Sequence, residues 1–269
     1  MERIAATAQG QVSNGAAEVY EEFFVPALFA QWPPYLAQAA AVGPGDRVLD
    51  VACGTGIAAR YLAAVTGPTG AVAGLDRNEG MLAVARRKAA QVEWRQGRAE
   101  ALPFAEGTFD AIVCQFGLMF FDDQVQALRE MARVVRPGGS IVVATWDTYT
   151  NSPGYARLIG LLAELFGEDV ADELRQPFAL SDTQAVAQLF ADAGMHNSAA
   201  TTHTGRARFP SLEAWISTEI RGWTLAEKLD ARAQQQLLAA AAKVMQPYIS
   251  GQGTVAFPAP AHFVRAAVP

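Results

Sequence analysis

The stretch from Val48 to Ala59, written VLDVACGTGIAA, constrains the fold of this chain more than any other segment. A short apolar run ends in Gly54-x-Gly56, and the residues from Ile57 onward have the composition of a helix. A strand that turns tightly through glycines into a helix is typical of doubly wound α/β sheets, where the turn and the helix N-terminus hold a cofactor. The spacing also fits the dinucleotide fingerprint in its G-x-G-x-x-A form. We therefore expect a cofactor-binding loop here, but its sequence alone does not identify the cofactor.

The residues around this loop repeat the same strand–helix unit. Five short apolar or β-branched runs predict strands, at 47–52, 71–76, 92–97, 109–116 and 140–146. Helices are expected between them, at 57–65, 79–90 and 122–135, the last one stopped by the RPGG sequence at 136–139. Strands that alternate with helices predict βαβ units and a parallel sheet with right-handed crossovers.

The pattern changes on both sides of this region. Two short helices are predicted before it, at 15–31 and 34–41, because the prolines after Trp32 break a helix interior but are tolerated at a helix start. After it, mainly helical segments are expected at 147–195 and 211–249, with a sixth and a seventh strand at 198–209 and 253–268. We expect one domain over residues 1–269, divided into an N-terminal helical lid (1–42), a cofactor-binding core (43–147) and substrate-side additions (148–269).

Composition excludes several classes of function. The chain has 21 basic and 27 acidic residues, a net charge of −6, which argues against a nucleic-acid partner because a basic patch would be expected. No apolar run approaches the ~18 residues that span a bilayer, and the start MERIAATAQGQ does not resemble a secretory signal. Cys53 and Cys114 are the only cysteines, so we expect a reducing, cytoplasmic setting, no disulfide framework and no metal site.

Two carboxylates discriminate between possible cofactors. Asp76 lies 20 residues beyond Gly56, where an acidic residue accepts hydrogen bonds from ribose hydroxyls of NAD and of S-adenosylmethionine alike. Asp50, four residues before Gly54, would repel the pyrophosphate of a dinucleotide but suits the ammonium and sulfonium groups of S-adenosylmethionine. Attraction between unit charges ~4 Å apart amounts to roughly 1 to 4 kcal/mol at effective dielectric constants of 80 to 20. The loop therefore favours S-adenosylmethionine.

Five sequence blocks carry a resemblance to a known family. DVACGTG, LDRNEGML, GRAEALPF, FDAIVCQFGLMFF and ALREMARVVRPGGSIVVATW, in this order, resemble class I S-adenosylmethionine-dependent methyltransferases. The resemblance is strong over residues 46–147 and points to the type 11 methyltransferase domain, found in ubiquinone/menaquinone-biosynthesis enzymes and many small-molecule methyltransferases. It implies an α/β, Rossmann-like, seven-stranded, mostly parallel sheet of order 3-2-1-4-5-7-6, with helices on both faces and helical lid elements at both ends.

The resemblance also implies cofactor contacts at particular positions. Asp50, Cys53, Gly54 and Gly56 match the motif that wraps the methionine part, and Asp76 matches the ribose ligand. Further matches are Arg77 and Met81 beside the adenosine, Ala99 and Glu100 flanking the adenine, and Gln115 and Phe116 at the methionine end. One position departs from the family pattern: Arg98 stands where an aspartate commonly accepts the adenine amino group. Recognition of adenine is therefore expected to fall to backbone groups or to Glu100.

Aromatic residues in the N-terminal helices and at the end of the cofactor-binding core and just beyond it suggest where the methyl acceptor binds. Phe24, Trp32, Trp146, Tyr149 and Tyr155 are expected to line a pocket for a flat or lipophilic molecule. Tyr20 or Phe24 is a candidate to close over the bound cofactor. Phe120 and Phe121 are equally compatible with the site and with the core. No catalytic side chain is identified, and three histidines (His196, His203, His262) are interpreted as surface or hydrogen-bonded residues.

These observations favour one function and leave two others open. We expect an S-adenosylmethionine-dependent methyltransferase that moves a methyl group to O, N or C of a small molecule by in-line displacement and releases S-adenosylhomocysteine. A non-methylating cyclase or binding protein with the same cofactor is an alternative, and an NAD-dependent oxidoreductase is disfavoured by Asp50. A homodimer is compatible with the sequence, which does not decide the oligomeric state.

Overall fold

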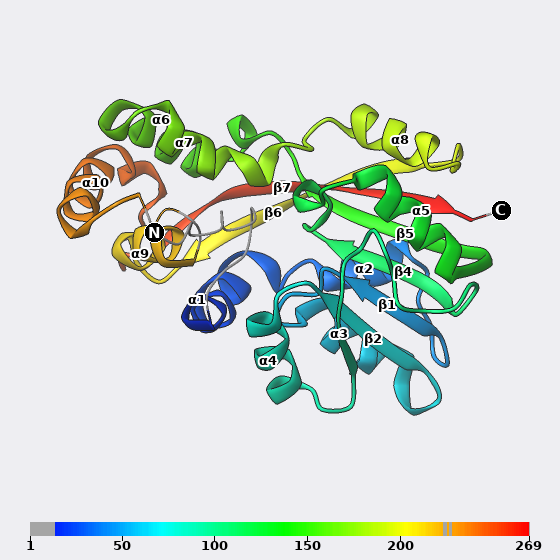
Figure 1. Cartoon of the computed structure of the whole chain (residues 1–269). Coiled ribbons are helices and arrows are strands. Elements are labelled where there is room, and N and C mark those ends of the chain that lie inside the picture. The colour runs from blue at the N-terminus through cyan, green and yellow to red at the C-terminus, as the bar shows by residue number, and fades with distance from the viewer. Residues whose placement is uncertain (1–13, 223–224, 226–227, 269) are drawn as a thin grey trace, which may run out of the picture.

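The computed structural model describes residues 14–222, 225 and 228–268, and places seven strands in one sheet of order β3-β2-β1-β4-β5-β7-β6 (Figure 1). The strands are β1 (Arg47–Val51), β2 (Ala71–Asp76), β3 (Glu93–Gln96), β4 (Phe109–Gln115), β5 (Val135–Trp146), β6 (Ala199–Phe209) and β7 (Val255–Ala267). The first five pair in parallel, and β7 runs antiparallel to both β5 and β6. The predicted fold class and strand order are confirmed.

Both faces of the inner parallel strands β1, β2 and β4 are buried, which explains their continuous apolar runs, whereas the edge strand β3 is largely exposed. In β1, Val48 packs into the core on one face with α2 (Pro33–Ala39) and α3 (Ile57–Thr66). Leu49 packs into the core on the other face with α5 (Gln124–Val134) and α8 (Thr183–Asp192). Alternate residues of one strand thus serve two cores, and the carboxyl ends of the strands stay free to form a site.

The helix that follows β2 begins at a side-chain cap. In α4 (Glu79–Lys88) the Asn78 side chain accepts a hydrogen bond from the Met81 N–H at 3.1 Å, which satisfies one of the free donors of the first turn. The three basic residues of its last turn face the negative end of the helix dipole. Asn78 thereby fixes the turn that directly follows Asp76.

Two predicted boundaries differ from the structure. The predicted helix at 15–31 is a short α1 (Asn14–Val19) followed by a π-helix, η1 (Tyr20–Phe29), which contains Pro26, a residue without an N–H to donate. Strand β5 begins at Val135 rather than at residue 140, because the RPGG segment ends α5 as predicted but then forms an irregular pairing opposite β4, with Gly138 at φ +78°.

The helical additions lie at one end of the sheet. β6 and β7 extend beyond the parallel strands, and α6 (Pro153–Phe166), α7 (Glu168–Arg175), α9 (Leu212–Gly222) and α10 (Ala231–Val244) gather around that end (Figure 1). The short helices are η2 (Gly67–Thr69), η3 (Leu118–Phe120), η4 (Tyr149–Asn151), η5 (Gln176–Phe178) and η7 (Gln246–Tyr248). One apolar core joins these additions to η1, α2 and α3, so they form a continuous body around the site.

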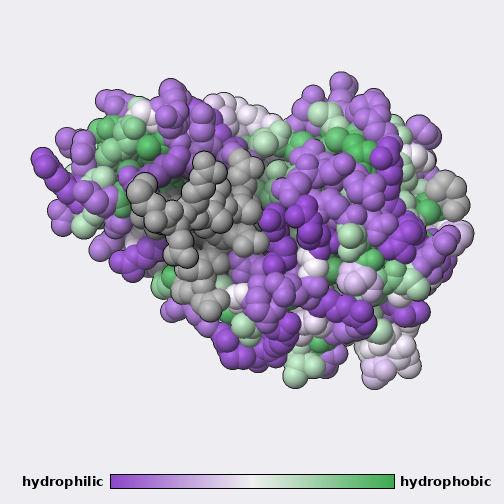
Figure 2. All heavy atoms as spheres, viewed as in Figure 1, coloured by the Kyte–Doolittle hydropathy of each residue, from purple (hydrophilic) through white to green (hydrophobic). Residues whose placement is uncertain are grey.

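The surface of the described residues shows no unusual feature in the view of Figure 2, where hydrophilic residues predominate and hydrophobic patches are small. Within the described part of the chain, no helix combines the length and the apolar character needed to cross a bilayer. Residues 1–13, which include the start of the predicted lid and the segment inspected for a secretory signal, lie outside the described residues.

Candidate functional site

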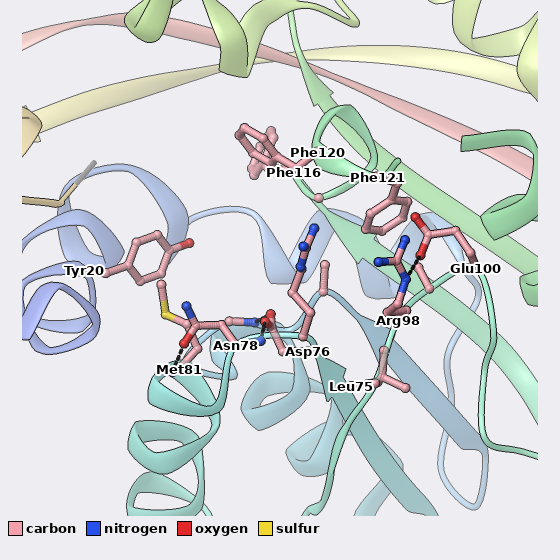
Figure 3. Close-up of a pocket in the computed structure, with 16 residues that line it drawn as sticks. Tyr20, Leu75, Asp76, Asn78, Met81, Arg98, Glu100, Phe116, Phe120 and Phe121 are labelled. Atoms are coloured by element: carbon pink, nitrogen blue, oxygen red, sulfur yellow. Dashed lines mark hydrogen bonds and ion pairs between the residues drawn. The ribbon is translucent and has the colours of Figure 1, made fainter. Parts of the chain in front are cut away.

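A cavity, here called the strand-end cavity, opens where β1, β2, β3 and β4 end (Figure 3). Its walls are formed by Tyr20, Ala52, Gly54, Leu75, Asp76, Arg77, Asn78, Met81, Gly97, Arg98, Ala99, Glu100, Phe116, Gly117, Phe120 and Phe121. In an open α/β sheet, ligands bind outside the carboxyl ends of the strands. The cavity therefore occupies the place where this fold binds cofactors.

Asp76 joins two loops of this cavity. One carboxylate oxygen, Oδ2, accepts the Gly54 N–H at 2.8 Å, and the other, Oδ1, accepts the Asn78 N–H at 2.8 Å. Burial raises the pKa of Asp76, while these backbone hydrogen bonds act in the opposite direction. Each carboxylate oxygen can accept more than one hydrogen bond, so Asp76 keeps acceptor capacity toward the cavity that it lines.

Asp50 has a position different from that of Asp76. Its side chain is 1% exposed beneath the glycine loop and does not line the strand-end cavity. Oδ2 accepts the Ala59 N–H at 2.9 Å, and Asp50 thereby caps the first turn of α3 from the preceding strand. Oδ1 has no hydrogen-bond partner among the described residues. Burial, and secondarily the charge of Asp76, raises the pKa of Asp50 to about 8.

The two glycines of the loop have different roles. Gly54 lines the cavity at φ +55°. Gly56 does not line it: it stands before α3 at φ +84°, and a Cβ there would overlap the Trp94 ring. Gly56 is thus required by backbone conformation and packing. Cys53, between β1 and Gly54, is buried, and burial raises the pKa of its thiol well above the usual range.

Two non-glycine residues at the cavity also adopt left-handed backbone conformations. Ala52 has φ +57° and Phe116 has φ +56°, and both line the cavity. Such conformations cost energy for residues with a Cβ and cluster at functional sites. The Phe116 N–H donates to the Ala144 carbonyl of β5 at 3.0 Å, which holds the strained residue in place.

The wall opposite the glycine loop is organised by Glu100. Its Oε1 accepts the Asp122 N–H at 2.9 Å, while Arg98 forms an ion pair with Asp122 (Nη2 to Oδ2, 2.6 Å) and lies 3.5 Å from Glu100 Oε2. The Glu100 carboxylate therefore fixes the loop before α5. The buried Ala99, which stands between Arg98 and Glu100 in the sequence, also lines the cavity.

Tyr20 covers the cavity from the helical side. Figure 3 shows its hydroxyl directed toward the cavity from η1. Its ring stacks on Phe29 with centroids 5.1 Å apart. Burial and the nearby Asp76 carboxylate raise the pKa of Tyr20 far above its usual range, so the phenol stays protonated and can donate.

A second, much smaller cavity, here called the aromatic cavity, lies between η1 and the helical additions. Its walls are formed by Phe24, Leu28, Phe29, Trp146, Tyr155, Leu174, Pro177, Phe178 and Glu219. Three residues predicted for the acceptor pocket, Phe24, Trp146 and Tyr155, are among them. Trp32 is fully buried and lines neither cavity, because it packs edge-on against Phe116 and Trp146.

The predicted site residues therefore divide into two groups. The strand-end cavity collects eight of the residues predicted to bind the cofactor: Tyr20, Gly54, Asp76, Arg77, Met81, Ala99, Glu100 and Phe116. Four others lie outside its walls, namely Asp50, Cys53, Gly56 and Gln115, and their contact with a cofactor stays a prediction. Tyr149 packs edge-on against Phe178 and lines neither cavity.

Sequence reasoning missed several residues of both cavities. Asn78 had a recognisable signal, since an asparagine before a helix is a preferred N-cap and it follows the predicted ribose ligand. Phe120 and Phe121, left open between site and core, line the strand-end cavity. Glu219 had no signal: a single glutamate in LEAWISTEIRG is indistinguishable from a solvent-exposed helix residue.

The histidines lie outside both cavities. His262 is buried between the Thr202 hydroxyl at 2.8 Å and the Ser181 carbonyl at 3.1 Å. His203 packs against Tyr35 with the ring planes tilted by 41°, and His196 is exposed. The interpretation of these residues as surface or hydrogen-bonded is confirmed. Among the residues that the structure describes, no cluster of His, Cys, Asp and Glu could hold a metal ion.

Sequence comparisons identify relatives of this chain. Residues 49–143 match a family described as a methyltransferase domain. The demethylmenaquinone methyltransferase of Lysinibacillus sphaericus is 35% identical over 181 residues, which cover 62% of this chain and 77% of that protein. A protein of the same name from Bacillus licheniformis is 34% identical over 203 residues, covering 66% of this chain and 86% of that protein.

Solved structures show the same fold at lower identity. A phosphoethanolamine N-methyltransferase 2 from Haemonchus contortus, in complex with phosphomonomethylethanolamine and S-adenosylhomocysteine, is similar with a TM-score of 0.61 and 17% identity, over 96% of this chain and 58% of that chain. An S-adenosylmethionine-dependent methyltransferase from Aquifex aeolicus has a TM-score of 0.54 and 20% identity, over 72% and 91% of the two chains. At these identities the similarity concerns the fold alone.

Proposed function

This chain belongs to the family of S-adenosylmethionine-dependent small-molecule methyltransferases, and we propose that its strand-end cavity is the cofactor site. The observation that carries the proposal is Asp76, a partly buried carboxylate at the end of β2 that holds the Gly54 loop and lines the cavity. An acidic residue there is suited to ribose hydroxyls. Tyr20 and the Ala99 backbone lie on the remaining walls, where the rest of the adenosine would bind.

The residues present fit the charged end of S-adenosylmethionine. Two buried acceptor oxygens, Asp50 Oδ1 and Gln115 Oε1, have no hydrogen-bond partner among the described residues. They belong to β1 and β4, which are neighbours in the sheet. Buried polar atoms are normally hydrogen-bonded, and both atoms belong to residues outside the walls of the strand-end cavity, so a proton donor that reaches behind these walls, from the ligand or from a bridging water, suits this place. An ammonium group carries three donors and would also stabilise the charge of Asp50.

The chemistry of the transfer would come from the cofactor, which supplies an activated methyl group when bound. The chain's own residues would align the acceptor for in-line displacement and exclude water. Phe116, Phe120 and Phe121 make one wall of the strand-end cavity apolar (Figure 3). Tyr20 is proposed to cover the bound cofactor, since its hydroxyl reaches over the cavity from η1.

The acceptor is proposed to be a small aromatic or lipophilic molecule, methylated at O, N or C. The apolar wall of the strand-end cavity formed by Phe116, Phe120 and Phe121 supports this, because it offers ring faces and edges to such a molecule. Two of the similar proteins are named demethylmenaquinone methyltransferases, so demethylmenaquinone is one acceptor to test among several aromatic compounds.

The proposal is tested by cofactor binding and by product formation. The protein is incubated with S-adenosylmethionine and candidate acceptors, and S-adenosylhomocysteine is quantified. Formation that depends on an acceptor supports methyl transfer. If S-adenosylmethionine and S-adenosylhomocysteine bind but none of the candidate acceptors leads to product, the non-methylating alternative would be favoured.

The role of Tyr20 is tested in the same assay. Tyr20→Ala is expected to lower the affinity for S-adenosylhomocysteine, whereas Tyr61→Ala, which changes a tyrosine that is 38% exposed, serves as the matched control. Equal affinities of the two variants would contradict the proposed covering role.

A further inference from the structure

We propose that Glu21 is a positioning residue of the cofactor site, because its ion pair with Arg60 holds the Tyr20 ring over the glycine loop. The inference rests on the proposed function, since it concerns binding of the same adenosyl cofactor. Neither Glu21 nor Arg60 lines the strand-end cavity, and neither belongs to the sequence blocks that carry the family resemblance.

The Tyr20 ring lies directly against the glycine loop. A Cβ built on Gly54 would be 3.8 Å from Tyr20 Cε1, and both residues line the strand-end cavity. Tyr20 also packs against a small apolar cluster in which α1 meets α4, formed by Ala17, Met81 and Val84. The ring therefore covers the cavity only while the start of η1 stays docked on the loop and on α4.

Apolar burial holds this part of the chain only at its two ends. Ala17 and Phe24 are fully buried, whereas residues 18–23 between them are half-buried or exposed. The first residues of a π-helix, an element that often occurs at functional sites, lie within this stretch. Polar contacts must therefore contribute to the position of Tyr20.

Glu21 supplies such a contact through both of its carboxylate oxygens. Arg60 Nη1 lies 2.9 Å from Glu21 Oε1, and Arg60 Nη2 donates to Glu21 Oε2 at 3.3 Å. Two parallel contacts of this kind fix the orientation of the partners as well as their distance. The Glu21 and Arg60 side chains are 11% and 20% exposed, so water screens this pair less than it screens a surface ion pair.

Arg60 connects the ion pair to the glycine loop. It belongs to α3, the helix that follows the loop, and its Nη1 also donates to the Thr55 carbonyl at 3.4 Å. Thr55 stands between the two glycines of the loop. A chain of contacts thus runs from Glu21 through Arg60 to the loop on which Tyr20 rests.

A longer contact joins Glu21 to the helix that follows β2. Lys88 Nζ lies 3.7 Å from Glu21 Oε1, and Lys88 is the last residue of α4. The exposed side chains of Glu18 and Arg87 form a further ion pair between α1 and α4. The Glu21 carboxylate is thus placed between the helices that follow β1 and β2, the two strands whose ends build the proposed cofactor site.

Loss of the Glu21 charge should weaken cofactor binding without changing a wall of the cavity. The docked position of Tyr20 would be less populated, and the apparent affinity falls in proportion to the population of the form that binds. The apolar contacts of Ala17 and Tyr20 would remain. We therefore expect a moderate loss of affinity, about fivefold, as for a partly buried ion pair.

The test is calorimetric titration of the full-length protein with S-adenosylhomocysteine. Glu21→Gln keeps the size of the side chain but removes its charge, and should bind this ligand about fivefold more weakly than the wild type. Glu22→Gln makes the same change at the exposed neighbouring position and should bind as the wild type does. Equal affinities of Glu21→Gln and Glu22→Gln would overturn the inference.

A double-variant comparison separates positioning from a general effect on folding. If Glu21 acts through Tyr20, Glu21→Gln should change the affinity by less than about twofold once Tyr20→Ala is present. Arg60→Met removes the pair from the other side, so it should also weaken binding, and Glu21→Gln should add little to its effect. An equal loss from Glu21→Gln with and without Tyr20 would show that Glu21 does not position this ring.

The same titrations separate this inference from the proposed function. If the wild type and Glu21→Gln bind S-adenosylhomocysteine equally well, the cofactor site stands and the role of Glu21 is refuted. If the folded wild type, checked by thermal unfolding, does not bind S-adenosylhomocysteine, the proposed function fails, and the role of Glu21 in holding this cofactor fails with it.

Discussion

Phe116 and Trp146 stack face to face, with ring centroids 3.9 Å apart and planes inclined by 7°. Phe116 follows β4 and lines the strand-end cavity, whereas Trp146 ends β5 and lines the aromatic cavity. The wall between the strand-end cavity and the aromatic cavity is thus built on two neighbouring strands of the sheet. Its position follows from strand pairing and does not depend on a surface loop.

The backbone of Phe116 leads to a stability prediction. Phe116→Ala should lower the free energy of unfolding by about 3–5 kcal/mol, because a buried ring and its stacking are lost. Glycine usually destabilises a strand relative to alanine, but at φ +56° the order should reverse, so that Phe116→Gly is the more stable of the two variants. Urea unfolding of both variants measures the order, and a less stable Phe116→Gly would contradict the described conformation.

The two loop glycines should separate binding from stability. Gly54→Ala places a methyl group in the wall of the strand-end cavity and should weaken binding of S-adenosylhomocysteine by tenfold or more. Gly56→Ala should lower the melting temperature more than Gly54→Ala, because both alanines would have a positive φ but only the Cβ at position 56 overlaps the Trp94 ring. Calorimetric titration and thermal unfolding of both variants distinguish the effects. Similar losses of affinity and of melting temperature in the two would show that the glycines have one shared role.

Asp50 should make stability depend on pH. Its pKa rises from 3.8 to about 8 on folding, so the folded form gains from the bound proton below pH 4 and loses this contribution as pH rises toward 8. Relative to Asp50→Asn, which keeps an oxygen for the Ala59 N–H, the wild-type free energy of unfolding should fall by about 5 kcal/mol between pH 4 and pH 8. Denaturant unfolding of both proteins between pH 4 and pH 8 measures this change. A difference in free energy of unfolding that does not vary with pH would contradict the raised pKa of Asp50.

Much of the fold was predictable because its signals are local. The alternation of apolar runs and helical segments, together with the glycine loop, fixes βαβ units, and the resemblance supplies the strand order that the structure confirms. The start of β5 was not predictable, since the RPGG segment ends a helix in either case and only its pairing opposite β4 makes it a strand. The π-helix around Pro26 likewise depends on packing beyond its own sequence.

Site residues were predictable where a sequence motif reflects a backbone requirement or a ligand contact. Gly54 and Asp76, which line the strand-end cavity, are of this kind. Gly56 belongs to the same motif, yet its immediate constraint is Trp94, a residue from another strand. Glu219 could not be predicted, because its partner Tyr155 is 64 residues away in the chain and its burial results from the assembly of several helices. The burial and the partners of such residues are set by tertiary packing, which no local sequence pattern encodes.

The central claim is that Asp76 anchors an adenosyl cofactor in the strand-end cavity. Its most direct test is calorimetric titration of the wild type and of Asp76→Ala with S-adenosylhomocysteine, with NADH as the competing ligand and thermal unfolding as a check on folding. We expect wild-type binding of S-adenosylhomocysteine without binding of NADH, and a loss of at least tenfold in affinity in a folded Asp76→Ala, as a hydrogen bond to a charged group contributes about 1.5–3 kcal/mol. Binding of NADH alone, or undiminished affinity in Asp76→Ala, would contradict it.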